Sequence, residues 1–526
     1  MKHAKIGGML AISAFAASAL AGNTPTPAEI SKLVAEGRDN SRVMATLREL
    51  CDIGPRLTGS PNLLRAQKWA VGQFKKYGLE NVRMEEWGDV PVGFERGARQ
   101  VGRMVSPFEY PITFTTPCWM PGTNGRISGE AVLAPKTMAE LEAMRGRLKG
   151  AFLVMPQAVS MRGAAAATTD EQKQLEAEIA KSGIAAKIFG TRDDRVHSYG
   201  SWRDKSFDKR PTETQIVVAK DDYDRIVRNV EYGRKPVLEF DIDNKWFKGP
   251  IKQYNVIAEL PGTDLKDEVV IVCGHLDSWN SPGSQGACDN GTGSTVTVEA
   301  ARILTQAKVK PRRTIRFILW SGEEQGLLGS RAYVEKHKGE LDKIVAVLND
   351  DGGTNYQGGY VATANQKDIL EAAMAPTIAA FPDLPMKLDI VERPSPGGSS
   401  DHAPFQWAGV PAYFTKEVGR ANYGKVWHTQ YDRYEAAIPE YLVQSATNHA
   451  LVGFHLATID EKLPRFPVQN RATTRAQLNH ALAVGADRMY EDPALHLGHD
   501  HDHEDDYILE MIDRLKRFVQ LLGIGR

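Results

Sequence analysis

V-V-I-V-C-G-H-L-D, Val269 to Asp277, is the stretch that decides the fold. Its first five residues are apolar, mostly β-branched and without alternation, which predicts a strand of a parallel sheet buried on both faces. His275 and Asp277 follow at the carboxyl end of this strand. In open α/β sheets, ligands bind at that edge. The stretch therefore predicts an α/β fold with a mostly parallel central sheet, flanked by helices, and a ligand site beside His275.

Three later segments show the same apolar pattern and are predicted to be strands of the same sheet. They are Thr314 to Trp320 (T-I-R-F-I-L-W), Ile344 to Leu348 (I-V-A-V-L) and Pro411 to Thr415 (P-A-Y-F-T). A helix is expected near Thr292 to Leu304, after a tight turn, and strands that alternate with helices are typical of a parallel sheet. We therefore expect the polar residues that follow the four strands to lie near one edge.

Histidines and carboxylates follow these apolar runs in a fixed order. They are His275, Asp289 in A-C-D-N-G, Glu323 and Glu324 in S-G-E-E-Q, Asp351 in N-D-D, and His428 in V-W-H-T-Q-Y-D. Neutral imidazole and carboxylate oxygen both bind Zn²⁺ at about 2.0–2.2 Å. Two metal ions roughly 3.5–4 Å apart can clamp both the attacking oxygen and the carbonyl oxygen of a hydrolysis. The set suits a paired zinc site with one shared carboxylate.

The order H-x-D, D-N, E-E, N-x-D, H-T-x-x-D resembles the co-catalytic zinc exopeptidases. This family includes bacterial leucyl-type aminopeptidases, glutamate carboxypeptidase II and plasma glutamate carboxypeptidase (carboxypeptidase Q). The resemblance covers roughly residues 40–105 and 250–460. It implies two zinc ions, with His275 and Asp351 on one, Glu324 and His428 on the other, and Asp289 as the bridge.

The resemblance also implies roles for neighbouring residues. Glu323 would be the general base, and Asp277 would orient His275, as ligating imidazoles usually require. The family places a cis peptide bond after the bridging Asp289. Its third aspartate stands two residues after an Asn, which selects Asp351 over Asp350. Neighbouring strand residues face opposite sides, so only one of these two is expected to be a ligand.

Candidates for the substrate pocket are weaker. Asp401 lies in S-S-D-H, which matches an S-D-H-x-P-F stretch that lines the active site in the family. Tyr423 and Arg420 lie close to His428 in sequence. They would shape a pocket or grip a terminal carboxylate, for which Arg is suited. A solvated charge is the alternative for Arg420.

The length of 526 residues allows two or three domains. Between the two matching regions, the chain is rich in Pro and Thr from Met104 to Asn124. A turn and a strand are expected from Arg145 to Met155, and helix or loop from Met161 to Thr191. This part resembles the protease-associated insert of the family. Such an insert would either form a lid over the zinc edge of the sheet or have a purely structural role. The expected division is 1–21 signal peptide, 22–105 first part of the peptidase domain, 106–249 insert, 250–465 main part and 466–526 tail.

Composition and the amino terminus point to an exported protein. The net charge of −1, from 65 basic and 66 acidic residues, gives no electrostatic ground for nucleic-acid binding. Lys2 and Lys5 precede the apolar stretch Ile6 to Leu20, and Ala19-Leu20-Ala21 fits the rule for signal-peptide cleavage. No later run reaches the ~18 apolar residues that span a bilayer. We expect a periplasmic or secreted protein, cut near Ala21, without a stable membrane anchor; an uncleaved anchor is the alternative.

Cysteines and the tail leave alternatives open. Cys51, Cys118, Cys273 and Cys288 allow three disulfide pairings or buried free thiols. The tract His496 to His503 (H-L-G-H-D-H-D-H) is typical of metal binding or of a solvated loop. A final helix, Tyr507 to Leu522, is expected to dock on the body or on a second subunit, which would make a homodimer.

The function expected from the resemblance is a zinc metallo-exopeptidase that acts on short peptides as an aminopeptidase or a dipeptidase. Two zinc ions would activate a bridging water, and Glu323 would remove its proton. The alternatives are a single-zinc acyl transferase like glutaminyl cyclase, an N-acyl amino acid hydrolase, and a non-catalytic binding protein on the same fold. Side-chain preference, native metal and oligomeric state lie beyond the sequence, because fold analogy does not transfer specificity.

Overall fold

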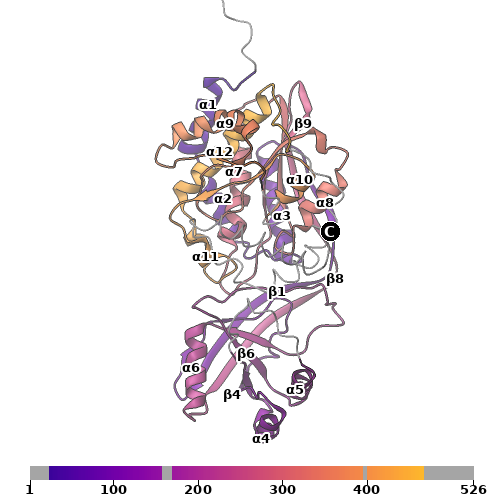
Figure 1. Cartoon of the computed structure of the whole chain (residues 1–526), viewed down its shortest axis with the longest axis vertical. Coiled ribbons are helices and arrows are strands. Elements are labelled where there is room, and N and C mark those ends of the chain that lie inside the picture. The colour runs from indigo at the N-terminus through magenta and orange to yellow at the C-terminus, as the bar shows by residue number, and fades with distance from the viewer. Residues whose placement is uncertain (1–22, 157–168, 395–399, 467–526) are drawn as a thin grey trace, which may run out of the picture.

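The computed structural model describes residues 23–156, 169–394 and 400–466. These residues form two lobes stacked along the long axis of the molecule (Figure 1). The signal peptide 1–21, the tract at His496 to His503 and the helix at Tyr507 to Leu522 lie outside the described residues. Among the described helices, none combines the length and the apolarity that crossing a bilayer requires.

A parallel sheet forms the centre of the larger lobe. Strand β9 (Leu265–His275) lies between β10 (Arg313–Trp320) and β11 (Ile344–Asn349), and β15 (Ala412–Phe414) extends the sheet beyond β11. All three pairings are parallel. The long strand β8 (Val237–Leu260) adds to β10 in the antiparallel direction. The four strands expected from the sequence are present, and the mostly parallel α/β fold is confirmed.

Helices bury both faces of this sheet, which explains why its strands are apolar without alternation. Val270 and Val272 of β9 belong to the hydrophobic core on one face, whereas Ile271 and Cys273 belong to the core on the other. The first core includes residues from α1 (Pro27–Val34), α2 (Val43–Cys51), α3 (Pro61–Lys76), α7 (Thr292–Gln306), α9 (Lys367–Ala380) and α12 (Pro439–Thr458). The second includes residues from α8 (Leu328–Lys336) and α10 (Ala403–Trp407).

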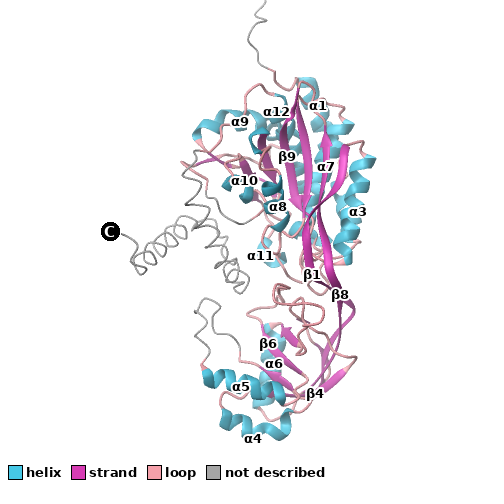
Figure 2. Cartoon of the chain, turned by 90° about the vertical axis from the view of Figure 1, so that its right-hand side faces the viewer, coloured by secondary structure: helices cyan, strands magenta, loops and turns pink. Residues whose placement is uncertain are grey.

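Two long strands connect the lobes. Strand β1 (Glu80–Ser106) pairs with β8 in the antiparallel direction, and both strands run from the larger lobe into the smaller one (Figure 2). There the sheet continues from β8 through β4 (Ile127–Leu133), β5 (Phe152–Val154), β6 (Ala186–Gly190) and β7 (Gln215–Val218) to β3 (Phe114–Thr115). Helices α4 (Met138–Leu148), α5 (Asp170–Lys181) and α6 (Lys220–Glu231) cover it. The smaller lobe has its own hydrophobic core around Phe152 and Phe240.

Two expectations for the smaller lobe were wrong in detail. Residues 145–148 are the end of helix α4, not a turn. Thr137 caps the start of this helix by accepting a hydrogen bond from the Glu140 amide, and the helix buries Leu141 and Leu148. Strand β6 lies where helix or loop was expected. Its segment A-K-I-F-G is short and interrupted by Lys187, and the parallel neighbours β5 and β7 supply the hydrogen bonds that make it a strand.

Short elements complete the described chain. They are η1 (Ala35–Asp39), β2 (Tyr110–Pro111), η2 (Ala287–Gly291), η3 (Leu341–Lys343), β12 (Tyr356–Gln357), β13 (Val361–Ala362), η4 (Ala364–Gln366), β14 (Asp389–Ile390), β16 (Glu417–Val418), α11 (Tyr423–Val426) and η5 (Tyr434–Ala436). The four cysteines are all buried free thiols, which is the second of the two alternatives left open by the sequence.

Candidate metal centre

Six of the residues singled out in the sequence lie at the carboxyl edge of the parallel strands, near the smaller lobe. His275 ends β9, Asp289 lies in η2 before α7, Glu323 and Glu324 follow β10, Asp351 follows β11, and His428 follows α11. Parallel strands bring their carboxyl ends to one edge, so residues far apart in sequence become neighbours. Five of the six form two groups of potential metal ligands that share Asp289.

The first group consists of His275, Asp289 and Asp351. Nε2 of His275 lies 3.0 Å from Oδ1 of Asp351 and 3.6 Å from Oδ1 of Asp289. All three residues are buried or nearly so, and their ligand atoms lie within 4.8 Å of one another. Atoms at these separations can each reach a common ion at about 2.0–2.2 Å.

The second group consists of Asp289, Glu324 and His428. Nε2 of His428 lies 3.2 Å from Oδ2 of Asp289 and 3.1 Å from Oε2 of Glu324. Asp289 therefore presents one carboxylate oxygen to each histidine. Its Oδ2 is buried and accepts no hydrogen bond from any described residue. Its close neighbour is the His428 imidazole, and a cation between the two groups would compensate the buried charge of the carboxylate.

The turn around Asp289 is tied to β11. The peptide bond between Asp289 and Asn290 is cis, as the resemblance implied. Nδ2 of Asn290 donates to the carbonyl of Asp350 over 2.8 Å, and Oδ1 of Asn290 accepts from the amide of Gly293 over 3.0 Å. Asn290 thus joins the start of α7 to the end of β11, and so holds the bridging carboxylate near Asp351.

Asp277 fixes two parts of the site at once. Its backbone carbonyl lies 3.0 Å from Nδ1 of His275, while its carboxylate is 3.7 Å away from the same atom. The carboxylate accepts a hydrogen bond from Thr58 Oγ1 over 2.8 Å and from the amides of Glu323 and Glu324, each over 3.3 Å. The carbonyl therefore orients the imidazole, and the carboxylate fixes the turn that carries both glutamates.

Glu323 lies beside the first group without belonging to it. Its Oε2 is 3.8 Å from Nε2 of His275. Burial raises the pKa of Glu323 well above its usual value. The charge of His275 opposes this increase, whereas the negative charges of Asp351 and Asp401 add to it. A buried carboxyl group with a raised pKa beside a candidate metal site suits general acid–base work.

His428 is held between aromatic rings and by its backbone. Its ring stacks on Trp427, with centroids 3.6 Å apart, and lies 5.5 Å from the ring of Trp279. Its φ of 56° is left-handed, a conformation that is uncommon for a residue other than glycine. Its carbonyl accepts hydrogen bonds from Ser281 Oγ over 2.8 Å and from the amide of Ser198 over 2.7 Å. Ser198 belongs to the connection between β6 and β7, in the smaller lobe.

The two adjacent aspartates after β11 are used differently. Asp351 faces His275, whereas Oδ2 of Asp350 accepts a hydrogen bond from Nε2 of Gln357 over 2.7 Å. Burial raises the pKa of Asp350 to about 7. The geometry thus separates the pair as the alternation of side chains requires.

Asp401 lies behind the site. It is fully buried, and its Oδ1 accepts a hydrogen bond from Ser330 Oγ, whereas its Oδ2 accepts none from a described residue. Burial raises the pKa of Asp401 to about 8. Its negative charge contributes to the raised pKa of Glu323.

Tyr423 and Arg420 differ in their relation to the cluster. Burial raises the pKa of Tyr423, and the charge of Asp289 adds to the shift, so this phenol lies near the cluster. The Arg420 guanidinium forms an exposed ion pair with Glu440, with Nη2 and Oε1 2.6 Å apart, and lies over the ring of Tyr441. This geometry agrees with the solvated-charge alternative for Arg420.

Arg56 was missed by the sequence analysis. It is completely buried, and its guanidinium donates hydrogen bonds to four backbone carbonyls, those of Leu276 (2.6 Å), Gly286 (2.7 Å), Gln285 (2.9 Å) and Gly54 (3.5 Å). It therefore joins the loop after His275 to the loop before Asp289. Backbone carbonyls are present at every position, so no sequence pattern could have indicated this role.

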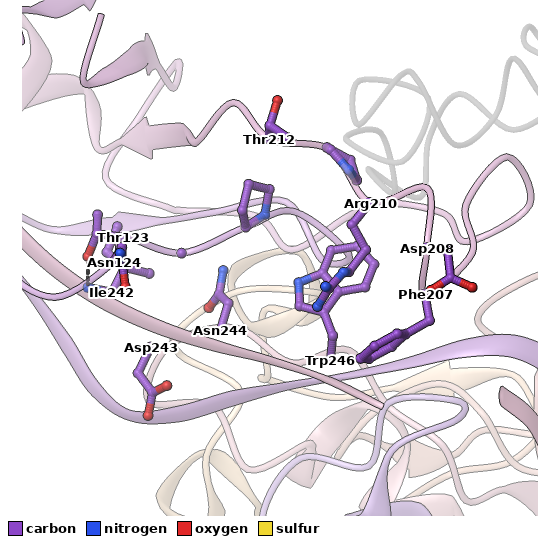
Figure 3. A pocket seen from close by; sticks show the side chains of 13 residues that line it. Thr123, Asn124, Phe207, Asp208, Arg210, Thr212, Ile242, Asp243, Asn244 and Trp246 are labelled. Carbon is purple, nitrogen blue, oxygen red and sulfur yellow. Dashed lines mark hydrogen bonds between the residues drawn. The ribbon is translucent and has the colours of Figure 1, made fainter. Parts of the chain in front are cut away.

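A cavity of about 580 Å³ lies in the smaller lobe and contains none of the residues of the metal cluster. Its walls come from residues 121–124, 207–208, 210–212, 242–244 and 246. Figure 3 shows the side chains of Phe207, Arg210 and Trp246 together on one side of it. The Arg210 guanidinium lies 4.2 Å from the centroid of the Phe207 ring.

Comparison with known proteins gives consistent matches. Residues 255–452 match the sequence profile of Peptidase family M28. Carboxypeptidase Q of Mus musculus is 29% identical over 441 residues, which cover 83% of this chain and 90% of that protein. A peptidase M28 precursor from Shewanella amazonensis SB2B has 24% identity, covers 84% of this chain and 98% of its own, and superposes with a TM-score of 0.59. BSAP, a zinc aminopeptidase from Bacillus subtilis, has 21% identity, covers 80% and 98%, and gives a TM-score of 0.51. The two structures share the fold.

Proposed function

We propose that this chain, a zinc metallo-exopeptidase similar to peptidase family M28, hydrolyses short peptides with two zinc ions, as an aminopeptidase or a dipeptidase. The observation that carries the proposal is the position of Asp289, whose two carboxylate oxygens face two different histidines. In this assignment, His275 and Asp351 hold one ion, Glu324 and His428 hold the other, and Asp289 holds both.

Zinc, when bound, lowers the pKa of an attacking water to about 7 and polarises the scissile carbonyl. Glu323 takes the proton from that water and passes it to the leaving amine. This role is supported by the place of its carboxylate, 3.8 Å from His275 Nε2, and by the burial that raises its pKa. Asp277 acts as a positioning residue, through the Glu323 amide and His275.

The insert, residues 106–249, forms a wall of the site in this proposal. Its support is the pair of backbone carbonyls that the insert binds. The Ser198 amide donates to His428, and Arg203 Nη2 donates to the carbonyl of Gln325 over 2.8 Å. The boundaries of the insert and of the tail stay predictions, as does export after cleavage near Ala21.

The proposal is tested by turnover on a panel of free dipeptides, amino-blocked dipeptides and aminoacyl anilides, with zinc content measured on the same sample. The expected result is cleavage that requires a free amino group, with about two zinc ions per chain. Preference for free dipeptides over anilides would assign a dipeptidase. One zinc ion per chain with cyclase or deacylase turnover, or no turnover by the zinc-loaded protein, would contradict it.

A further inference from the structure

A segment of the smaller lobe, residues 193–203 in the connection between β6 and β7, contacts the two loops that carry Glu324 and His428 of the second ligand group. We call this segment the strap. It is anchored in its own lobe, because the carbonyl of Asp193 accepts from the Lys220 amide over 2.9 Å. The carbonyl of Tyr199 accepts from the Cys118 amide over 2.7 Å.

The middle of the strap holds the loop that carries His428. Beside the bond from the Ser198 amide to the His428 carbonyl, the side chain of Gln430 makes two hydrogen bonds to the strap backbone. Its Oε1 accepts from the Val196 amide over 2.9 Å, and its Nε2 donates to the Asp194 carbonyl over 2.9 Å. Gln430 is only 7% exposed, and its bond to the Val196 amide is buried, whereas its bond to the Asp194 carbonyl is partly buried.

The end of the strap holds the loop that carries Glu324. Arg203 Nη2 donates to the carbonyl of Gln325, the residue that directly follows Glu324. Consecutive Cα atoms are about 3.8 Å apart, so the bond acts within one residue of the ligand. The strap therefore binds two backbone carbonyls of the second group's loops, that of Gln325, next to Glu324, and that of His428 itself.

The backbone of His428 needs such support. A residue other than glycine in the left-handed region costs on the order of 1 kcal/mol or more and persists where the surrounding structure determines it. His428 has a φ of 56°, and its carbonyl is bound by Ser281 of the larger lobe and by Ser198 of the strap. Removal of the strap leaves one of these two bonds.

We propose that the strap positions the metal ligands His428 and Glu324, so that docking of the smaller lobe and zinc binding stabilise each other. The proposal rests on the proposed function, in which these two residues hold zinc. Coupling of this kind is reciprocal: if the docked strap favours zinc, bound zinc favours the docked strap by the same factor.

The first test is zinc affinity measured by competition with a chromophoric chelator. In Gln430→Leu, which keeps the size of the side chain but loses both bonds to the strap, the zinc ion held by Glu324 and His428 is expected to lose about 10–100-fold in affinity, as on loss of other partners behind metal ligands. Tyr431→Phe removes the bond to the Asp194 carboxylate and leaves the two bonds of Gln430 to the strap backbone in place, so it should have a smaller effect. The matched control is Arg99→Gln, which breaks an exposed ion pair with Asp241 elsewhere in the smaller lobe and should leave zinc affinity unchanged.

The second test uses the unchanged protein, so it does not depend on the folding of a variant. Hydrogen exchange of the Val196 and Ser198 amides is expected to slow when zinc is added and to recover when zinc is chelated. Two results would overturn the coupling. One is a folded Gln430→Leu variant whose zinc affinity stays within about twofold of the original, and the other is an exchange rate of the strap amides that does not change when zinc is added. Absence of zinc binding in the unchanged protein would instead overturn the proposed function.

Discussion

Oδ2 of Asp289 lies 3.2 Å from Nε2 of His428, while the other oxygen of the same carboxylate faces His275. One carboxylate between two imidazoles is the arrangement that a bridging metal ligand requires. Its buried oxygen accepts no hydrogen bond from any described residue. The two-metal assignment therefore depends on Asp289 more than on any other residue.

Asp289→Asn is expected to weaken the binding of both zinc ions. The amide presents one neutral oxygen in place of two charged ones, so neither group keeps its full ligand set. The loss of zinc affinity should exceed the ~10–100-fold that follows loss of a partner behind a ligand. Zinc titration of purified protein checks this, and a variant that still binds two zinc ions with unchanged affinity would rule out the bridge.

Glu323→Gln is expected to separate catalysis from metal binding. Glu323 is not in either ligand group, so zinc content should stay as it is, while turnover falls by ~10²–10⁴, as is common when a general base is removed. The measurement is kcat together with zinc content on one sample. Turnover close to that of the original protein would refute the role of Glu323.

Arg56→Lys is expected to destabilise the larger lobe and both ligand groups. A lysine ammonium cannot reproduce the planar fork that binds the carbonyls of Leu276, Gln285 and Gly286. Each buried carbonyl left without a partner costs about 1–3 kcal/mol. Urea unfolding of the zinc-free protein should show a loss in the free energy of unfolding, with a smaller loss for the exposed-pair variant Arg99→Gln. Equal stability of Arg56→Lys and the original would contradict this account.

His449 is expected to make stability sensitive to mild acid. It is fully buried in α12, neither ring nitrogen has a hydrogen-bond partner among the described residues, and burial lowers its pKa to about 3. Because this pKa is below the value of about 6.5 in the unfolded chain, the contribution is complete at higher pH and is lost as pH falls below about 6.5. Near pH 5.5 the loss from one such histidine is about 1.4 kcal/mol.

The variant His449→Leu checks this prediction. Urea unfolding of the zinc-free variant and of the original, near pH 7.5 and near pH 5.5, gives the change in stability between the two conditions. The change should be smaller in His449→Leu by about 1.4 kcal/mol. An identical change in both proteins would show that His449 does not titrate on unfolding.

The sequence predicts the parts of the fold whose signal is local. The strand at Val269 to Cys273 is apolar throughout because helices bury both of its faces, and that pattern is visible without a structure. The long strands β1 and β8 mix charged with apolar residues along much of their length and are not apolar throughout. Each gains its strand conformation from pairing with the other, which is a tertiary effect.

The same distinction applies to the site. His275, Glu324 and Asp351 each end or follow a predicted strand, so their meeting at one edge could be foreseen. Arg56 and Ser198 act on backbone carbonyls in distant segments. Backbone groups are the same at every position, so these contacts leave no pattern in the sequence and appear only in the folded chain.

The most direct measurement is a crystal structure of the zinc-loaded protein with anomalous scattering recorded at the zinc absorption edge. The account predicts two zinc peaks roughly 3.5–4 Å apart, one on each side of the Asp289 carboxylate. One ion would lie against His275 and Asp351, and the other against Glu324 and His428. A single peak, or two peaks without Asp289 between them, would contradict the central claim.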